Sequence, residues 1–232
     1  MKNILFIASE GVPFIKTGGL ADVVGSLPKG IDKEYYDVRV ILPKYNCMHQ
    51  DKKDMLHYRD HFYMEFNWKN EYVGILEAEY DGIKYYFIDN EYYFGGEKPY
   101  SDARYDLEKF AFFSRAVLSA LPVIDFRPDV IHCHDWHTGL IPVYLKDSFA
   151  SGEFYQGIKI LHAVKIEMRA YLQLKILQLC LHGRNTAVYL VLLGALNCVQ
   201  HHIDSLGIGT DIVYGIYSRY PQFKVTGGNG LH

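Results

Sequence analysis

Short apolar runs alternate with amphipathic segments along the first part of the chain. Residues 3–8 (NILFIA) form a continuous apolar run, which is typical of a strand buried on both faces of a parallel sheet. A helical pattern begins around Leu20 and stops before Pro28, and residues 37–42 (DVRVIL), closed by Pro43, have the pattern of the next strand. This order predicts a βαβ unit with a right-handed crossover.

A hairpin and a second alternation of helix and strand follow. Residues 72–78 and 83–88 flank Asp81-Gly82, a dipeptide that favours a two-residue hairpin turn. Apolar side chains recur at helical spacing over residues 107–121, and we expect Pro122 to end that helix.

Another short strand is predicted at residues 130–133, with a helix over residues 140–146. Strands that alternate with helices, with one antiparallel insertion, predict an α/β fold. Its sheet is doubly wound (Rossmann-like) and mostly parallel, with a β-hairpin insertion.

The charge pattern changes near residue 160. Residues 1–160 contain 18 Lys and Arg and 24 Asp and Glu, whereas residues 161–232 contain only 6 and 3. We therefore predict a boundary there, with a domain at 1–160 and an unassigned apolar segment at 161–232. A contiguous apolar segment of this kind favours self-association.

Overall composition points to an ordinary globular protein of the cytoplasm. The 232 residues are 49% hydrophobic and 22% charged, with a formal net charge of −3, which gives no support for binding nucleic acid. The four cysteines form no CxxC pair, which fits a reducing compartment. No apolar run is long enough to span a bilayer, and residues 1–8 lack the pattern of a signal peptide. We therefore expect no membrane partner.

A glycine-containing loop with one lysine follows the first predicted strand. Lys16, Gly18 and Gly19 lie at the strand end, where doubly wound sheets bind ligands. Glycines allow close approach of the backbone, and the following helix start presents N–H groups to an anion. The spacing matches neither the GxGxxG nor the P-loop motif, which weakens an NAD(P)-dependent oxidoreductase reading. An ordinary turn with a solvated lysine is the alternative.

The segment His132-Cys133-His134-Asp135-Trp136-His137 holds several side chains that bind metals elsewhere. On a strand, however, His132 and His134 face one side and Cys133 the other, so we expect no metal. A carboxylate and an imidazole at a strand end suit a substrate rich in hydroxyl groups. The alternative is that Trp136 packs in the core and Asp135 caps the next helix.

Tyrosines are concentrated in a glycine-containing stretch, residues 92–102, which includes Tyr100. Exposed tyrosines can stack on sugar rings, although such loops are more often packed lids.

Several motifs, taken in order, resemble the bacterial glycogen synthase and plant starch synthase family. The resemblance covers about residues 1–159 and rests on KTGGLADVVG (16–25), PKY (43–45), FAFFSRA (110–116), RPDV (127–130) and HDWHTGL (134–140).

This resemblance implies the N-terminal domain of a retaining GT-B glucosyltransferase. Such an enzyme moves glucose from ADP-glucose to the non-reducing end of an α-1,4-glucan such as glycogen. It needs no metal and no other cofactor.

The family motifs also imply roles for particular residues. Lys16, Gly18 and Gly19 correspond to the ADP-glucose-binding loop, Asp135 to a catalytic residue, and Asp22, Tyr100 and His137 to the acceptor cleft. His162 lies near the position of a catalytic histidine, although its neighbours, Ile160 to Lys165, differ from the family's T-[IV]-H-N segment.

The resemblance fades where the charge pattern changes. Residues 161–232 are too few for the second Rossmann-like domain of a GT-B enzyme, so we expect that domain to be absent here. A frameshift, a fusion or a truncation would each explain the apolar segment. On this reading the chain is a weakly active or inactive synthase, and the alternative is a non-catalytic remnant that binds glucan or a partner.

Overall fold

The computed structural model describes residues 1–163, which fold around one mixed sheet. Its strand order is β3-β4-β5-β2-β1-β6-β7, and β5, β2, β1, β6 and β7 pair in parallel. The strands are β1 (Lys2–Ile7), β2 (Tyr36–Pro43), β3 (His57–Phe66), β4 (Lys69–Tyr80), β5 (Ile83–Asp89), β6 (Val130–His134) and β7 (Lys159–Ala163). The predicted α/β, doubly wound, mostly parallel sheet with a β-hairpin insertion is therefore confirmed.

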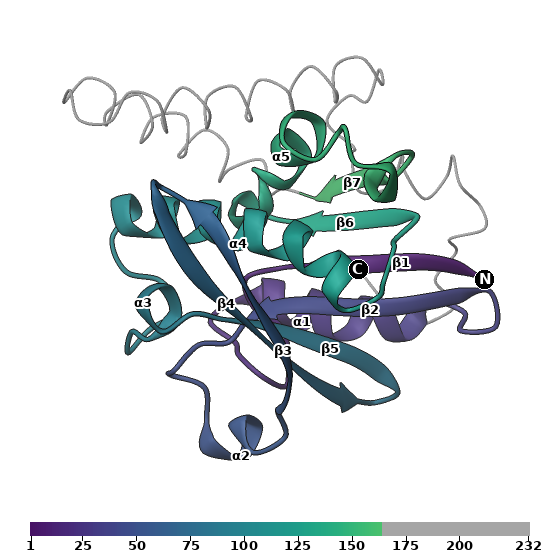
Figure 1. Cartoon of the computed structure of the whole chain (residues 1–232). Coiled ribbons are helices and arrows are strands. Elements are labelled where there is room, and N and C mark those ends of the chain that lie inside the picture. The colour runs from purple at the N-terminus through teal and green to yellow at the C-terminus, as the bar shows by residue number, and fades with distance from the viewer. Residues whose placement is uncertain (164–232) are drawn as a thin grey trace, which may run out of the picture.

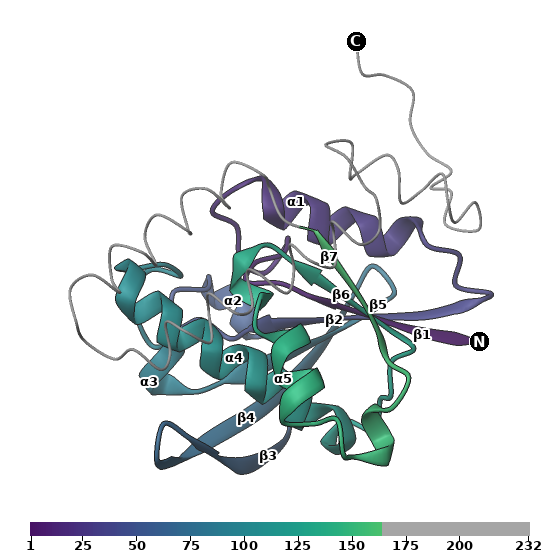
Figure 2. The same ribbon diagram turned by 90° about the horizontal axis from the view of Figure 1, so that it is seen from above.

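Helices cover both faces of this sheet. Figures 1 and 2 show α1 on one face, with α4 and α5 on the other. The helices are α1 (Gly19–Ser26), α2 (Gln50–Lys53), α3 (Glu91–Phe94), α4 (Ala103–Val123) and α5 (Ile141–Asp147), and short 3₁₀ turns lie at Leu27–Gly30, Trp136–Thr138 and Glu153–Tyr155. Within residues 1–163, no helix is both long and apolar enough to cross a membrane.

The core forms where the sequence is continuously apolar. Leu5 and Ile7 of β1 are fully buried, and so are Phe112 and Phe113 of α4, which packs on the sheet. Strands of a parallel sheet have a continuous apolar pattern because helices pack on both faces of the sheet and exclude water from them.

The hairpin is larger than predicted. Asp81 and Gly82 both have positive φ (56° and 68°), as the expected hairpin turn between β4 and β5 requires. Strand β3 corresponds to none of the predicted elements; it pairs antiparallel with β4 and forms an edge of the described sheet. The insertion is therefore a three-stranded meander whose last strand, β5, joins the parallel sheet beside β2.

The expected end of the long helix at Pro122 was wrong. Helix α4 continues to Val123, with Pro122 inside its last turn. A proline has no N–H to donate to the carbonyl four residues earlier, which here belongs to Leu118. The hydroxyl of Tyr155 donates to that carbonyl oxygen at 2.9 Å. A side chain distant in sequence thus replaces the missing donor.

Strand β7 crosses the position at which the charge pattern changes. Its residues pair with β6 through Val130↔Lys159 to His134↔Ala163, so the sheet extends past residue 160. The boundary near residue 160 stays a prediction, as does self-association through the apolar segment, because residues 164–232 lie outside the described residues.

Close packing of α1 on the loop after β1 leads to a prediction about Gly25. A Cβ atom at this position would lie 2.2 Å from Val12 Cγ2 and 2.7 Å from the Val12 carbonyl oxygen. We expect Gly25→Ala to lower the free energy of unfolding by about 1–3 kcal/mol, because helix and loop must separate. Urea denaturation would measure the loss. The matched variant Gly19→Ala should cost nothing, since no atom lies within 4 Å of its new Cβ; equal stability of both variants would contradict the packing argument.

Candidate functional site

The carboxyl ends of β1, β6 and β7 meet at one edge of the sheet. These strands are adjacent and parallel, so the residues that follow them gather there. Ser9 and Glu10 follow β1, Asp135 follows β6, and His162 is the second-last residue of β7. This edge is where ligands bind in doubly wound sheets.

A buried carboxylate fixes the loop between β1 and α1. Glu10 is only 3% exposed, and its Oε2 accepts hydrogen bonds from the backbone N–H and the hydroxyl of Thr17. Gly18 then continues with extended backbone (φ −153°, ψ −166°) into α1. Among the described residues, no side chain caps the first turn of α1. Its N–H groups are therefore available to an anion.

Lys16 lies beside this helix start. Its Nζ donates to Asp22 Oδ1 at 2.7 Å, and both side chains are about half exposed, at 53% and 54%. An exposed pair of this kind contributes at most about 1 kcal/mol to stability. The ion pair with Asp22 thus holds Lys16 near the loop, and little energy is needed to break it when a ligand binds.

The two glycines of this loop are not needed by the fold. Neither has positive φ, and a Cβ at Gly18 would approach only Glu10 Oε1, at 3.6 Å. At Gly19 a Cβ would meet no atom within 4 Å. Side chains would therefore be tolerated here, and the space that they would fill is open for a ligand.

Asp135 occupies a strained turn at the end of β6. Its φ of 61° and ψ of 179° lie in a region that non-glycine residues rarely adopt, at a cost of about 1–3 kcal/mol. Its side chain accepts a hydrogen bond from Trp136 N at 2.8 Å, as a cap of the Trp136–Thr138 turn. Strain of this kind is common at functional sites.

Strand β7 holds this turn in place. Asp135 N donates to the Ala163 carbonyl oxygen at 2.7 Å, and the Asp135 carbonyl oxygen lies 2.9 Å from His162 Nε2. Because a carbonyl only accepts, His162 carries its proton on Nε2. Burial lowers the pKa of His162, so this imidazole is neutral near pH 7. In this structure His162 supports the backbone at Asp135.

Tyr100 connects the aromatic loop to the end of β1. Its hydroxyl lies 2.8 Å from Ser9 Oγ, and its ring stacks on His137 with centroids 4.9 Å apart. Burial raises the pKa of Tyr100 above its ordinary value. His137 itself is buried between Tyr100, Phe110 and Trp136. His137 therefore packs against one face of the Tyr100 ring and supports it from the core.

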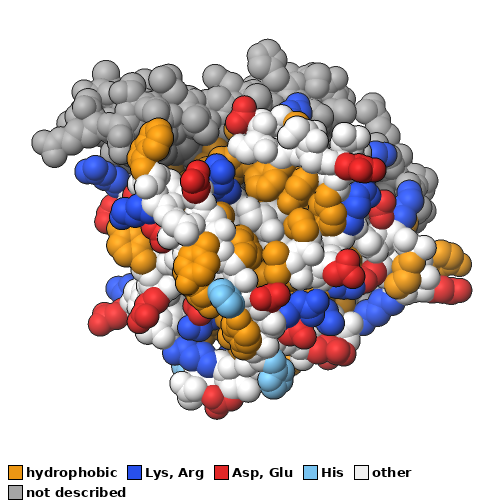
Figure 3. Space-filling view, viewed as in Figure 1, with side chains coloured by type: hydrophobic (Ala, Val, Ile, Leu, Met, Phe, Trp, Pro, Cys, Tyr) orange, Lys and Arg blue, Asp and Glu red, His pale blue; other side chains and the backbone are white. Residues whose placement is uncertain are grey.

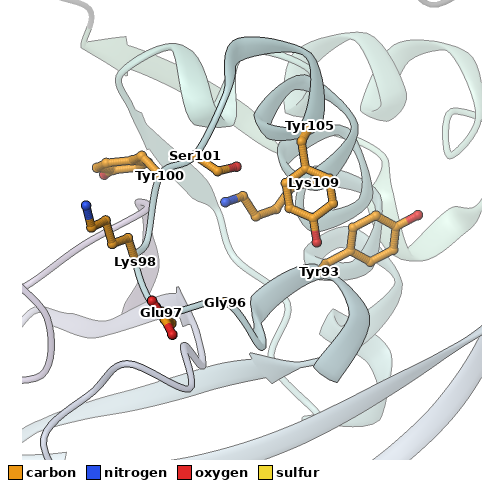
Figure 4. Close-up of a pocket in the computed structure, with 8 residues that line it drawn as sticks. All are labelled: Tyr93, Gly96, Glu97, Lys98, Tyr100, Ser101, Tyr105 and Lys109. Atoms are coloured by element: carbon orange, nitrogen blue, oxygen red, sulfur yellow. The ribbon is translucent and has the colours of Figure 1, made fainter.

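A pocket of about 290 Å³ lies beside Tyr100 (Figure 4). Lys109 of α4 extends into it with a side chain that is only 2% exposed. Its Nζ donates to Asp106 Oδ1 at 2.7 Å and to the Pro99 carbonyl oxygen at 2.6 Å. The pocket is lined by Tyr93, Gly96, Glu97, Lys98, Tyr100, Ser101, Tyr105 and Lys109.

The histidines of β6 face the core as strand alternation requires. The rings of His132 and His134 lie 4.1 Å apart and both contact Phe6, whereas Cys133 points to the other face. Within residues 1–163, no three His, Cys, Asp or Glu side chains are arranged to hold a metal ion.

The residues that hold the loops of the site in place were not predicted from the sequence. Glu10 and Ser9 hold the two loops, and Asp106 and Lys109 hold the segment before Tyr100. One signal was available for the first pair, because polar residues that directly follow a buried strand lie at the ligand-binding edge. A buried lysine and aspartate three residues apart in an amphipathic helix cannot be distinguished from a surface pair by sequence alone.

Comparison with known proteins shows the family to which this chain belongs. Residues 3–176 match the family model described as the starch synthase catalytic domain. The chain therefore belongs to the starch synthase catalytic domain family.

The relatives are glycogen and starch synthases. The chain is 64% identical over 159 residues to a glycogen synthase of Lachnospira eligens, which covers 68% of this chain and 33% of that protein. It is 63% identical over 164 residues to one of Lachnoclostridium phytofermentans, covering 71% and 34%.

A solved structure shares the fold. The catalytic domain of starch synthase IV from Arabidopsis thaliana, bound to ADP and acarbose, matches with a TM-score of 0.59 and 30% identity. This match covers 70% of this chain and 34% of that one. The chain thus spans about a third of the length of the relatives that it matches.

Proposed function

We propose that the chain is part of a glucosyltransferase that moves glucose from ADP-glucose to the non-reducing end of an α-1,4-glucan, and that it contributes residues to both the donor and the acceptor sites. Family membership supports the class of reaction, and the starch synthase IV structure, which holds ADP and acarbose, supports a nucleotide and a glucan as ligands. One observation in this chain carries the proposal. The loop after β1 keeps two glycines that the fold does not need, beside a lysine and a free helix start.

The donor diphosphate binds this loop. Lys16 contributes a full positive charge, Gly18 and Gly19 let the phosphate oxygens approach the backbone, and α1 directs N–H groups toward them. Charge at this position matters for the reaction, because the bond from the sugar to the diphosphate breaks and the departing ADP gains negative charge. Preorganised donors at those oxygens lower the barrier without a metal.

Asp135 binds the transferred glucose. A carboxylate at a strand end accepts hydrogen bonds from sugar hydroxyls, and the strained turn fixes its direction. His162 contributes to this site by donating a hydrogen bond to the Asp135 carbonyl oxygen, which positions the turn.

The acceptor glucan lies on the Tyr100 side of the site. Tyr100 presents an aromatic ring supported by His137, and Asp22 accepts a hydrogen bond from Lys16. Tyr100 and Asp22 line the proposed acceptor cleft, and the buried His137 contributes by packing against Tyr100.

Replacing Lys16 provides the direct test. We expect Lys16→Ala to raise the dissociation constant for ADP roughly tenfold to a hundredfold, because a charge-assisted hydrogen bond contributes about 1.5–3 kcal/mol. Isothermal titration calorimetry with ADP would measure it. The matched variant Lys33→Ala, another exposed lysine, should bind ADP like the parent. Equal affinity in all three proteins would refute the donor site.

A further inference from the structure

The outer face of the β3–β4 hairpin carries a cluster of aromatic side chains away from the proposed cleft. The tyrosine platform, as we call it, consists of Tyr58, His61, Tyr63 and Tyr72. The His61 and Tyr72 rings are stacked with centroids 5.7 Å apart and planes at 27°, and Tyr63 meets Tyr72 edge to face at 5.7 Å. Figure 3 shows a histidine among hydrophobic side chains over these two strands.

A glycine makes room for the Tyr72 ring on the sheet surface. Gly74 lies opposite His61 across the two strands, and a Cβ there would come within 2.8 Å of the Tyr72 hydroxyl and 3.0 Å of its ring. The Tyr72 ring therefore lies along the sheet surface over Gly74. A further contact, 2.6 Å between the Tyr58 hydroxyl and His61 Nδ1, fixes the imidazole.

These rings are exposed to a degree that the fold does not explain. Tyr58 is 61% and Tyr63 is 59% exposed, although ordering a side chain costs conformational entropy that burial normally offsets. The four ordered rings share one sheet face, and because Tyr63 lies nearly perpendicular to Tyr72 they present both ring faces and ring edges to a ligand.

The charges around the platform disfavour an anionic ligand. Asp89 lies beside Gly74 on the next strand and is paired with Lys44 at 3.3 Å. Glu65, two residues after Tyr63 on the same exposed face of β3, adds a carboxylate that can accept hydrogen bonds from hydroxyl groups. The phenol and imidazole groups and this ion pair offer hydrogen bonds at the rim. Ring faces with polar rims suit a sugar, which has apolar C–H faces and hydroxyl edges.

A second copy of the chain fits this surface poorly. Strand β3 is interrupted by a bulge between Tyr58 and Asp60 and carries the charged residues Asp60 and Glu65 at exposed positions. Bulges and charges on an edge strand oppose pairing with another strand.

The hairpin is also connected to the proposed acceptor side. Asn90 Nδ2 donates to the Tyr72 carbonyl oxygen at 2.8 Å, and the Asn90 side chain caps α3. Helix α3 carries Tyr93, which lines the pocket beside Tyr100 (Figure 4).

We propose that the tyrosine platform is a second glucan-binding site, which holds a neutral α-glucan chain outside the catalytic cleft. This proposal rests on the proposed function for the identity of the polymer. The tyrosine platform and the cleft bind their ligands independently, so different substitutions weaken binding at each of them.

Affinity electrophoresis of the 232-residue chain through gels containing glycogen tests the proposal. The double variant Tyr58→Ala/Tyr63→Ala removes exposed rings only, and circular dichroism would verify that it folds. We expect its apparent dissociation constant for glycogen to rise roughly tenfold or more, as for the loss of central aromatic anchors. Tyr63→Phe, which keeps the ring, and Tyr35→Ala, which removes a tyrosine of 60% exposure elsewhere, should bind like the parent.

The outcomes separate this proposal from the proposed function. Lys16→Ala should lose ADP affinity and keep its glycogen retention, whereas the platform variant should show the reverse. If the platform variant is retained like the parent, or if the parent is not retained at all, the second site is refuted while ADP binding still tests the donor loop. A change in self-association in place of glycogen retention, measured by sedimentation, would also overturn it in favour of a second copy.

Discussion

Lys109→Met is expected to lower the free energy of unfolding by about 3–5 kcal/mol, although methionine matches the lysine stem in shape. Lys109 and Asp106 form an ion pair with side chains only 2% and 7% exposed. Removing the ammonium leaves the Asp106 carboxylate buried without its cationic partner, and water cannot compensate it there.

The loss should spread to the loop before Tyr100. Asp106 also accepts hydrogen bonds from the backbone N–H and the hydroxyl of Ser101, and Lys109 donates to the Pro99 carbonyl oxygen. The ion pair therefore fixes Pro99 and Ser101, the two residues next to Tyr100 in the sequence. Weaker glucan binding at the cleft is the expected functional consequence.

Urea denaturation would measure the change in stability. The matched variant Lys98→Met replaces an exposed lysine that lines the same pocket, and it should change stability by less than about 0.5 kcal/mol. The double variant Asp106→Asn/Lys109→Met should recover most of the loss, because no unpaired charge remains. A single Lys109→Met variant as stable as the parent would show that the pair is not buried in solution.

Acidification from pH 7.5 to pH 5 should cost about 4 kcal/mol of stability through two buried histidines. Burial lowers the pKa of His134 to about 4 and that of His137 to about 3, from an ordinary value of 6.5. The proximity of His162 and Lys109, respectively, lowers them further.

The direction follows from where protons bind. Above pH 6.5 both histidines are neutral in the folded and unfolded chains, so neither affects stability. Below pH 6.5 the unfolded chain takes up protons, while the folded chain does not until the pH approaches 4 or 3. Each histidine therefore costs about 1.4 kcal/mol for each pH unit in that window, which gives about 2 kcal/mol at pH 5.

Urea denaturation at a series of pH values would measure this dependence. His137→Gln should reduce the loss by about 2 kcal/mol and leave the part due to the other buried histidines, which include His132 and His162, whose pKa values burial also lowers. His57→Gln, which changes an exposed histidine, should leave the profile unchanged. If His137→Gln had the same pH profile as the parent, the assignment to this residue would be wrong.

Much of the parallel sheet was predictable because its signals are local. The apolar run over residues 3–8 and the Asp81-Gly82 turn each specify their element without help from distant residues. β3 was missed although Phe62, Met64 and Phe66 alternate toward the core, because Tyr58 and Tyr63 put aromatic residues on the exposed face as well. The alternation of apolar and polar residues is therefore blurred at this strand.

The candidate site was only partly predictable, since its geometry depends on contacts between distant segments. Position after a strand sufficed to select Lys16 and Asp135 as candidates. The continuation of α4 through Pro122 depends on Tyr155, and the neutral state of His137 depends on Tyr100 and Phe110 around it. Such pairings follow from the tertiary structure and have no local signal.

The clamp on Asp135 links the proposed sugar site to the mechanical integrity of the sheet edge. Its amide and carbonyl are both held by residues of β7, the outermost strand on that side of the described sheet. Outer strands open by local fluctuation more readily than central ones. The strained turn therefore persists only while β7 stays paired with β6, so fraying of one short strand would relax the site without unfolding the core.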